Sequence, residues 1–146
     1  MFDVLERDTD VLDNAMADGA AGTTLRTAEQ VESGFPIDAV DRLTAMLSPD
    51  DPNFAYRLVP RATLTRRRAT PGARLTTEES SKVLRVWAVW AMARKVWKDD
   101  AKARRWLFRP HMMLNDRPAI DVVLASEFGR PIVEGILGRA YYGIPS

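Results

Sequence analysis

Few residues of this chain have the types and spacing that catalysis requires. Its 146 residues include one histidine, His111, and no cysteine, which excludes a disulfide, a thiolate zinc site and a thiol nucleophile. A general base needs a positioned partner and a reacting group within reach. Because His111 stands beside two methionines, we interpret it as a loop or packing residue. We therefore predict no enzyme, no catalytic residue, no metal site and no cofactor.

Two pairs of adjacent carboxylates are also better explained by structure than by chemistry. Asp99-Asp100 and Glu78-Glu79 stand where predicted helices begin, and carboxylates there complement the helix dipole. The sequence contains no nucleophile-elbow motif, no zinc-binding His-Glu-x-x-His motif and no phosphate-binding glycine loop.

The strongest basic feature is the run of three arginines at 66–68. On a helix, three consecutive side chains spread over most of a turn, so they cannot all face a core. Arg61, Thr63, Thr65 and Arg68 could reach phosphates or base edges in DNA. The alternative is a solvated helix face that pairs with acidic residues nearer the N-terminus.

Charge is distributed very unevenly along the chain. Residues 1–52 have a net charge of −9, residues 53–110 a net charge of +11 and residues 111–146 a net charge of −1, although the whole chain carries only +1. A block this basic can attract phosphates. Neutralisation of the basic block by the acidic block, within one chain or across a dimer, would explain the same pattern.

Apolar residues recur at helical spacing through the chain, and no segment alternates as a half-buried strand would. Pro118 opens a short helix, and Ser126 caps a last helix whose apolar side carries Ile132, Val133, Ile136 and Leu137. The longest helix carries a completely apolar stretch at 86–93, so we expect it to be buried on nearly every side. This helix is predicted over residues 76–97, with Thr76 or Thr77 as its cap. Other helices are predicted over residues 27–33 (capped by Thr27), 36–47, 54–58, 61–69 and 99–108. The last of these is capped by Asp99 or Asp100 and turns Ala103, Trp106 and Leu107 inward, and residues 115–117 are predicted to form a turn.

The helices at 54–58 and 61–69 have the outline of a helix-turn-helix, with the arginine run on the second helix. We therefore predict an all-α fold in which a helix-turn-helix-like N-terminal region packs with a C-terminal helical domain. Residues 1–24 are acidic and interrupted by glycines, and are predicted to be a flexible arm. The segment 140–146 is apolar and aromatic, so it either folds back on its own domain or docks on a partner.

From Val59 to the C-terminus, five blocks occur in the order and at the spacing of a known family. These blocks are Val59–Arg68, Leu75–Arg85, Ala101–Pro110, Arg117–Asp121 and Gly138–Pro145. In them the chain resembles antitoxins of the RES–Xre type, the Xre/MbcA/ParS-like toxin-binding family. The resemblance covers about three fifths of the chain.

The resemblance implies a type II antitoxin that occludes the NAD pocket of an NAD-consuming, RES-domain toxin and represses its own operon as a dimer. It implies that residues 25–74 serve dimerisation and DNA binding and that residues 75–146 bind the toxin. The DNA-facing residues would be Arg61, Thr63, Arg66, Arg67 and Arg68. The toxin-binding residues would be Arg139, Tyr141, Tyr142, Gly143, Ile144 and Pro145.

Two further expectations follow from the sequence. Without a signal peptide or a membrane span of about 18 apolar residues, we expect a cytoplasmic protein that does not bind a membrane. The competing hypothesis on function is a stand-alone helix-turn-helix regulator without a toxin partner.

Overall fold

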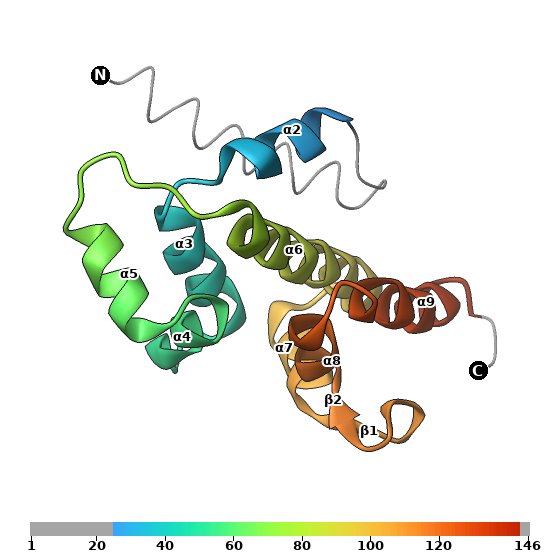
Figure 1. The fold of residues 1–146 in the computed structure, drawn as a ribbon. Coiled ribbons are helices and arrows are strands. Elements are labelled where there is room, and N and C mark those ends of the chain that lie inside the picture. The colour runs from blue at the N-terminus through green and yellow to red at the C-terminus, as the bar shows by residue number, and fades with distance from the viewer. Residues whose placement is uncertain (1–24, 144–146) are drawn as a thin grey trace. The chain divides into compact units, whose positions relative to one another are not determined.

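The computed structural model describes residues 25–143. The expected flexible arm at 1–24 and two of the expected toxin-binding residues, Ile144 and Pro145, lie outside the described residues. The chain forms two compact units that divide between Leu84 and Arg85, and each is described by itself below. The predicted all-α class is confirmed (Figure 1).

The first unit is a set of short helices whose apolar side chains meet in one core. It contains α2 (Leu25–Ser33), α3 (Asp38–Leu47), the 3₁₀ turn η1 (Pro52–Phe54), α4 (Ala55–Leu58), α5 (Arg61–Arg68) and the start of α6 (Thr77–Trp97). Its core side chains are at most 1% exposed and include Phe35, Val40, Leu43, Leu47, Leu58, Val59 and Leu64.

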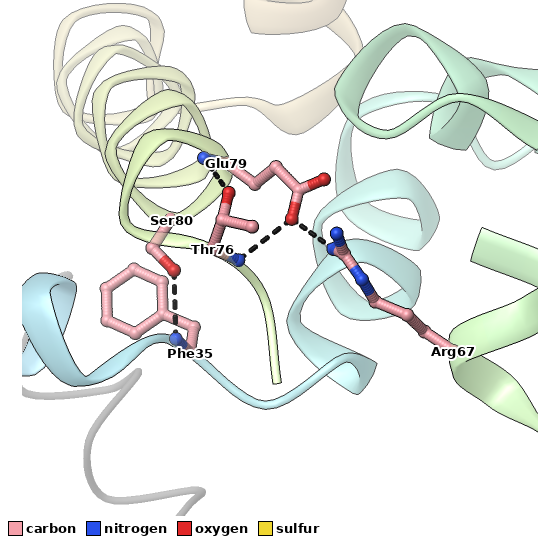
Figure 2. Close-up of polar contacts among 5 residues, drawn as sticks. All are labelled: Phe35, Arg67, Thr76, Glu79 and Ser80. Carbon is pink, nitrogen blue, oxygen red and sulfur yellow. Dashed lines mark hydrogen bonds and ion pairs between the residues drawn. The ribbon is translucent and has the colours of Figure 1, made fainter. Parts of the chain in front are cut away.

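The start of α6 is fixed by a reciprocal pair of hydrogen bonds (Figure 2). The Glu79 backbone N–H donates to Thr76 Oγ1 at 3.1 Å, and the Thr76 backbone N–H donates to Glu79 Oε1 at 2.8 Å. This capping box satisfies two backbone donors that a helix start otherwise leaves unpaired. Of the two predicted caps, Thr76 and Thr77, the structure has Thr76, and the carboxylates predicted in the first turn are present there.

The starts of α2 and α3 differ from the prediction. Thr27, expected as a cap, is buried inside α2, which already begins at Leu25. Pro36, expected in the first turn of the next helix, instead forms an isolated β-bridge with Arg74, and α3 begins at Asp38. The tertiary pairing of this stretch with residues 74–75 explains the later start, because the Phe35 carbonyl accepts from the Leu75 N–H at 2.9 Å.

The second unit contains the rest of α6, then α7 (Asp100–Phe108), β1 (Pro110–His111), the 3₁₀ turn η2 (Met112–Leu114), β2 (Arg117–Pro118), α8 (Ala119–Ala125) and α9 (Gly129–Tyr141). Of the two predicted caps of α7, Asp99 and Asp100, the structure has Asp99, whose Oδ1 accepts from the Lys102 N–H at 2.9 Å. The buried residues of α7 are Ala103, Trp106 and Leu107, as predicted.

The pair of short strands β1 and β2 was not predicted. β1 and β2 pair antiparallel, with Pro110 opposite Pro118 and His111 opposite Arg117. Two-residue strands are too short to show the alternation by which strands are found in a sequence. The turn predicted at 115–117 is confirmed at Asn115 and Asp116, which have the left-handed φ values of 55° and 62°, whereas Arg117 already belongs to β2.

The last helix also begins later than predicted. Ser126 is the C-cap of α8, and α9 begins only at Gly129. A Cβ on Gly129 would lie 2.0 Å from the Val122 carbonyl oxygen, so only glycine lets the start of α9 approach the backbone of α8 this closely. The late start places Pro131 within the first turn, where a proline is tolerated.

Arg85 closes the C-terminal end of α8. Its guanidinium donates to the carbonyls of Val123 at 2.7 Å and Leu124 at 3.0 Å, two of the carbonyls that a helix end leaves unpaired. Burial lowers the pKa of Arg85, and the nearby charge of Glu127 acts in the opposite direction. Arg85 therefore holds the turn that leads into α9.

Candidate functional site

The first candidate surface is α5, which carries the five residues predicted to face DNA. Leu64 is fully buried and anchors this helix to the core of the first unit. The other side of the helix carries arginines, but their side chains have very different surroundings.

Three of the four arginines already have a partner within the first unit. The Arg61 guanidinium lies over the Tyr56 ring, 5.3 Å from its centroid. Arg67 forms a half-buried ion pair with Glu79, the residue that caps α6 (Figure 2). Arg68 Nη2 lies 2.5 Å from Asp41 Oδ1, and this pair is exposed.

The fourth arginine, Arg66, is exposed, and its guanidinium makes no hydrogen bond or ion pair within residues 25–143. Thr63 is half-buried. Arg66 is therefore the arginine of the run that can bind an external anion without first giving up a contact inside the chain.

The pairing of Arg67 with Glu79 affects the pKa of the Glu79 carboxylate. Burial by itself raises the pKa of Glu79, but the hydrogen bonds from Arg67 and Thr76 and the charge of Arg67 together hold it below its ordinary value of 4.5. The ion pair links α5 to the start of α6 and so positions the arginine helix. No local signal in the sequence predicts this contact, because the two residues lie on different helices.

The second candidate surface is α9. Its buried side holds Val133, Ile136 and Leu137, and its close neighbours include Met92, whose Cε would lie 3.6 Å from a Cβ on Gly138. Ile132 was predicted to belong to this buried side, and that prediction is wrong, because Ile132 is 51% exposed. Helix register alone does not explain this exposure, because Ile136, one turn further along the same side of α9, is buried. The exposure of Ile132 depends on how far the packing of other elements extends along α9.

The solvent side of α9 carries a stripe of large side chains. We call the exposed set Phe128, Ile132, Arg139 and Tyr142 the α9 stripe; its members are spaced by four, seven and three residues and so lie on one helix face. Phe128 is 71% exposed and Tyr142 74% exposed. Gly135 lies between Ile132 and Arg139 on the same helix face. A Cβ on Gly135 would be 3.7 Å from Arg139 Nη1, so the guanidinium lies along the helix surface over this glycine.

Two tyrosines form the end of this surface. The rings of Tyr141 and Tyr142 pack edge to face, with centroids 5.1 Å apart. Lys95 Nζ lies 4.8 Å from the centroid of the Tyr141 ring, which holds this ring against α6 although it remains 44% exposed. Gly143 then takes a left-handed φ of 68°. Arg139, Tyr141, Tyr142 and Gly143 are thus brought to one end of α9.

Chemistry of other kinds finds little support in residues 25–143. His111, predicted to be a packing residue, is buried, with Nε2 2.7 Å from the Trp106 carbonyl oxygen and its ring 4.6 Å from the Trp106 ring. Within these residues no group of three or more His, Asp or Glu side chains could hold a metal ion. None of the helices described is both long enough and apolar enough to cross a membrane.

Comparisons with known proteins agree with this two-part division of the chain. Residues 26–86 match the model of the antitoxin Xre-like helix-turn-helix domain, and residues 92–143 match that of the antitoxin Xre/MbcA/ParS C-terminal toxin-binding domain. The α5 arginines fall in the first match and the α9 stripe in the second.

A curated relative covers most of the chain. Antitoxin Xre of Yersinia enterocolitica (serotype O:8 / biotype 1B) is 31% identical over 125 residues, which span 84% of this chain and 82% of the relative. The chain therefore belongs to the Xre family of antitoxins, with an Xre-like helix-turn-helix domain followed by an Xre/MbcA/ParS toxin-binding domain.

Proposed function

We propose that this antitoxin neutralises a RES-domain, NAD-consuming toxin by covering the toxin's NAD pocket. The observation that supports this most directly is the exposed apolar surface of the toxin-binding domain. Seven large hydrophobic side chains are exposed within residues 25–143, and six of them lie in residues 92–143, which match the toxin-binding domain. These six are Met112, Met113, Phe128, Ile132, Tyr141 and Tyr142. Apolar area left in water in this way marks a protein interface.

The proposed inhibition is steric and needs no reacting group of the antitoxin. Aromatic and arginine side chains supply most of the binding energy of protein interfaces, and the end of α9 presents Arg139, Tyr141 and Tyr142 together. The toxin-binding segment is proposed to run from Arg139 through Tyr141, Tyr142 and Gly143 to Ile144 and Pro145. In this proposal the α9 stripe docks on the toxin and the segment after it covers the pocket entrance.

A truncation tests this proposal directly. The chain is co-expressed with the RES-domain toxin expected from the neighbouring gene, and cell growth and cellular NAD are measured. Removal of residues 141–146 is expected to abolish protection and allow NAD to fall, because the aromatic anchors are lost. A truncated chain that folds, by circular dichroism, and still protects fully would show that the tail is not the inhibitory segment.

We also propose that the antitoxin binds its own operator as a dimer in the cytoplasm, through α5 in the helix-turn-helix domain. The proposed contacts are Arg61, Thr63, Arg66, Arg67 and Arg68. Of these, Arg66 supports the proposal best, because its guanidinium makes no hydrogen bond or ion pair within residues 25–143, whereas Arg67 and Arg68 would have to exchange an ion pair for a phosphate. Gel filtration with light scattering tests the dimer, and fluorescence anisotropy with promoter DNA tests the operator.

The helix-turn-helix match by itself also fits a regulator that has no toxin partner. A pull-down with the product of the neighbouring gene separates the two. A stable complex supports the antitoxin proposal. Operator binding without any stable complex supports the stand-alone regulator.

A further inference from the structure

The second unit contains a pocket of about 270 Å³ that the proposed toxin contacts do not use. It lies at the corner where α6 ends and α7 begins, because Lys98, between the two helices, takes a left-handed φ of 55° and turns the chain. Five residues line the pocket, namely Trp97, Lys102, Arg105, Trp106 and Arg109.

The pocket concentrates positive charge. Lys102 and Arg105 lie three residues apart on α7, which places them on one helix face, where like charges repel. Arg109 follows as the C-cap of α7 and lines the same pocket. They are exposed, and none of the three forms a salt bridge within residues 25–143. The cluster is therefore available to an anion.

The carboxylates next to the pocket are already engaged. Asp99 accepts the hydrogen bond from the Lys102 backbone N–H. This hydrogen bond is the main reason why the pKa of Asp99 is held below its ordinary value, and the charges of Lys102 and Arg105 add to it. Asp100 pairs with Arg94 instead, with Nε and Oδ1 2.9 Å apart. The charge of Asp99 thus acts on Lys102 and Arg105, and Asp100 is held by Arg94.

Two indole rings form the apolar part of the lining. Trp106 is 7% exposed, and its ring packs on His111, so its position is fixed. Trp97 is half-buried, and its Nε1 is buried with no hydrogen-bond partner among the described residues. Because this nitrogen is itself shielded from solvent, the pocket offers a ligand other atoms of the Trp97 side chain rather than the N–H donor.

The pocket is separate from the tyrosines at the end of α9. Tyr141 contacts α6 through Lys95, two residues before Trp97, and residues two apart on a helix do not share a face. The pocket can therefore be occupied independently of the proposed toxin-binding segment.

We propose that this corner pocket binds a nucleotide, with its phosphate held by Lys102, Arg105 and Arg109 and its base against the indole rings of Trp97 and Trp106. Arginine binds phosphate through paired hydrogen bonds, and bases stack on aromatic side chains. At about 270 Å³ the pocket lies just below the range of about 300–1,000 Å³ that small-molecule sites usually occupy, so it has room for at most one nucleotide. The nucleotide can be free or part of a DNA strand, and the experiment distinguishes these sources.

The test titrates the full-length chain with four probes: AMP, adenosine, inorganic phosphate and a single-stranded DNA pentamer. Calorimetry measures affinity, and tryptophan fluorescence reports on the pocket, since two of the four tryptophans of the chain line it. We expect AMP or the pentamer to bind and to quench fluorescence. Adenosine and phosphate should each bind at least about tenfold more weakly, because each keeps only one half of the interaction.

Two variants locate the binding. Arg105→Ala combined with Arg109→Ala is expected to weaken AMP or pentamer binding at least about tenfold, since two charge-assisted contacts are lost. Lys98→Asn is the matched control, because it removes a neighbouring exposed cation outside the pocket lining and asparagine tolerates a left-handed φ. Circular dichroism shows that both variants fold.

Each binding result either identifies the source of the nucleotide or overturns the proposal. AMP binding that depends on Arg105 and Arg109 identifies a free nucleotide as the ligand, and pentamer binding alone with the same dependence identifies a DNA strand. The proposal is overturned if none of the probes binds, or if the double variant binds them as the Lys98→Asn control does. If the wild-type chain binds none of the probes and the double variant also loses toxin binding, the pocket instead binds an acidic side chain of the toxin.

Discussion

At the scale of single residues, the arginine run divides into side chains with different tasks. Arg67 and Arg68 hold ion pairs with Glu79 and Asp41, and Arg61 lies on a tyrosine ring. Arg66 has no such contact in the described chain. A run that looks uniform in the sequence therefore contains structural arginines and one that is available for DNA.

This division predicts how substitutions in α5 affect DNA binding. Arg66→Ala should weaken operator binding by about 1–3 kcal/mol if it reads a base, or reduce the salt slope by about one unit if it contacts a phosphate. Thermal stability should stay unchanged because no internal contact is lost. Fluorescence anisotropy at several salt concentrations measures both quantities.

Arg67→Ala is the matched comparison for Arg66→Ala. It should lower the unfolding temperature, because it leaves Glu79 half-buried without its cation. An Arg66→Ala chain that binds operator DNA normally, beside an Arg67→Ala chain that is stable but fails to bind, would reverse the assignment.

The lowered pKa of Glu79 makes stability depend on pH. A carboxylate whose pKa is lower in the folded chain stabilises the fold above its unfolded pKa, and this contribution is lost as pH falls through the folded pKa. The unfolding temperature of the wild type should therefore fall as pH is lowered from 4.5. Glu79→Gln should be less stable at neutral pH and should show a smaller fall.

Glu78→Gln is the control for Glu79→Gln, since it removes an adjacent exposed carboxylate that lies outside the Arg67 pair. This variant should keep the pH dependence of the wild type. Thermal melts followed by circular dichroism between neutral and acidic pH provide the comparison. Identical curves for Glu79→Gln and the wild type would exclude a stabilising role for the ion pair.

At the scale of elements, α9 and the capping residue at each of its ends combine a structural side and a binding side. Gly129 allows it to start against α8, and Val133 and Leu137 bury one face completely. The α9 stripe occupies the opposite face. Substitutions on the stripe can therefore change binding without changing the core.

The element-scale prediction concerns the apolar members of the stripe. Phe128→Ser combined with Ile132→Ser should weaken toxin binding by at least about 2 kcal/mol, as loss of interface anchors does. The unfolding temperature should change little because both side chains are exposed. Calorimetry or surface plasmon resonance with the purified toxin measures the affinity.

Met112→Ser supplies the control, because Met112 is 88% exposed but lies in η2 rather than on the stripe. Its affinity for the toxin should be closer to that of the wild type than the affinity of the double variant is. If Met112→Ser weakens binding as strongly as the double replacement, the interface is centred on the β1–β2 hairpin and not on α9.

At the scale of the whole molecule, the two proposed partners should respond differently to salt. DNA binding through arginines releases counterions, so three phosphate contacts would weaken it about 40-fold between 50 and 200 mM salt. Toxin binding through the α9 stripe buries apolar area and should change far less. Parallel titrations of promoter DNA and toxin, at both salt concentrations, test this difference. Equal salt dependence for both partners would contradict the assignment of separate surfaces.

The sequence by itself determined the helical class, most of the helices and the family. These features depend on local signals, such as apolar spacing, the Thr76 and Asp99 caps, and blocks of residues in a fixed order. It also showed that the aromatic residues at 141–142 need an explanation, because exposed apolar side chains are unfavourable in water.

Only the tertiary structure decided which side chains are left over for partners. Ile132 faces solvent while Val133 is buried, and Arg66 stays unpaired in the described chain while Arg67 pairs with Glu79. The short β1–β2 pair, the late start of α9 and the corner pocket at Trp97 likewise depend on contacts between separate elements. Helical spacing states which residues share a face, but packing against other elements decides which face is covered, and that information is not local in the chain.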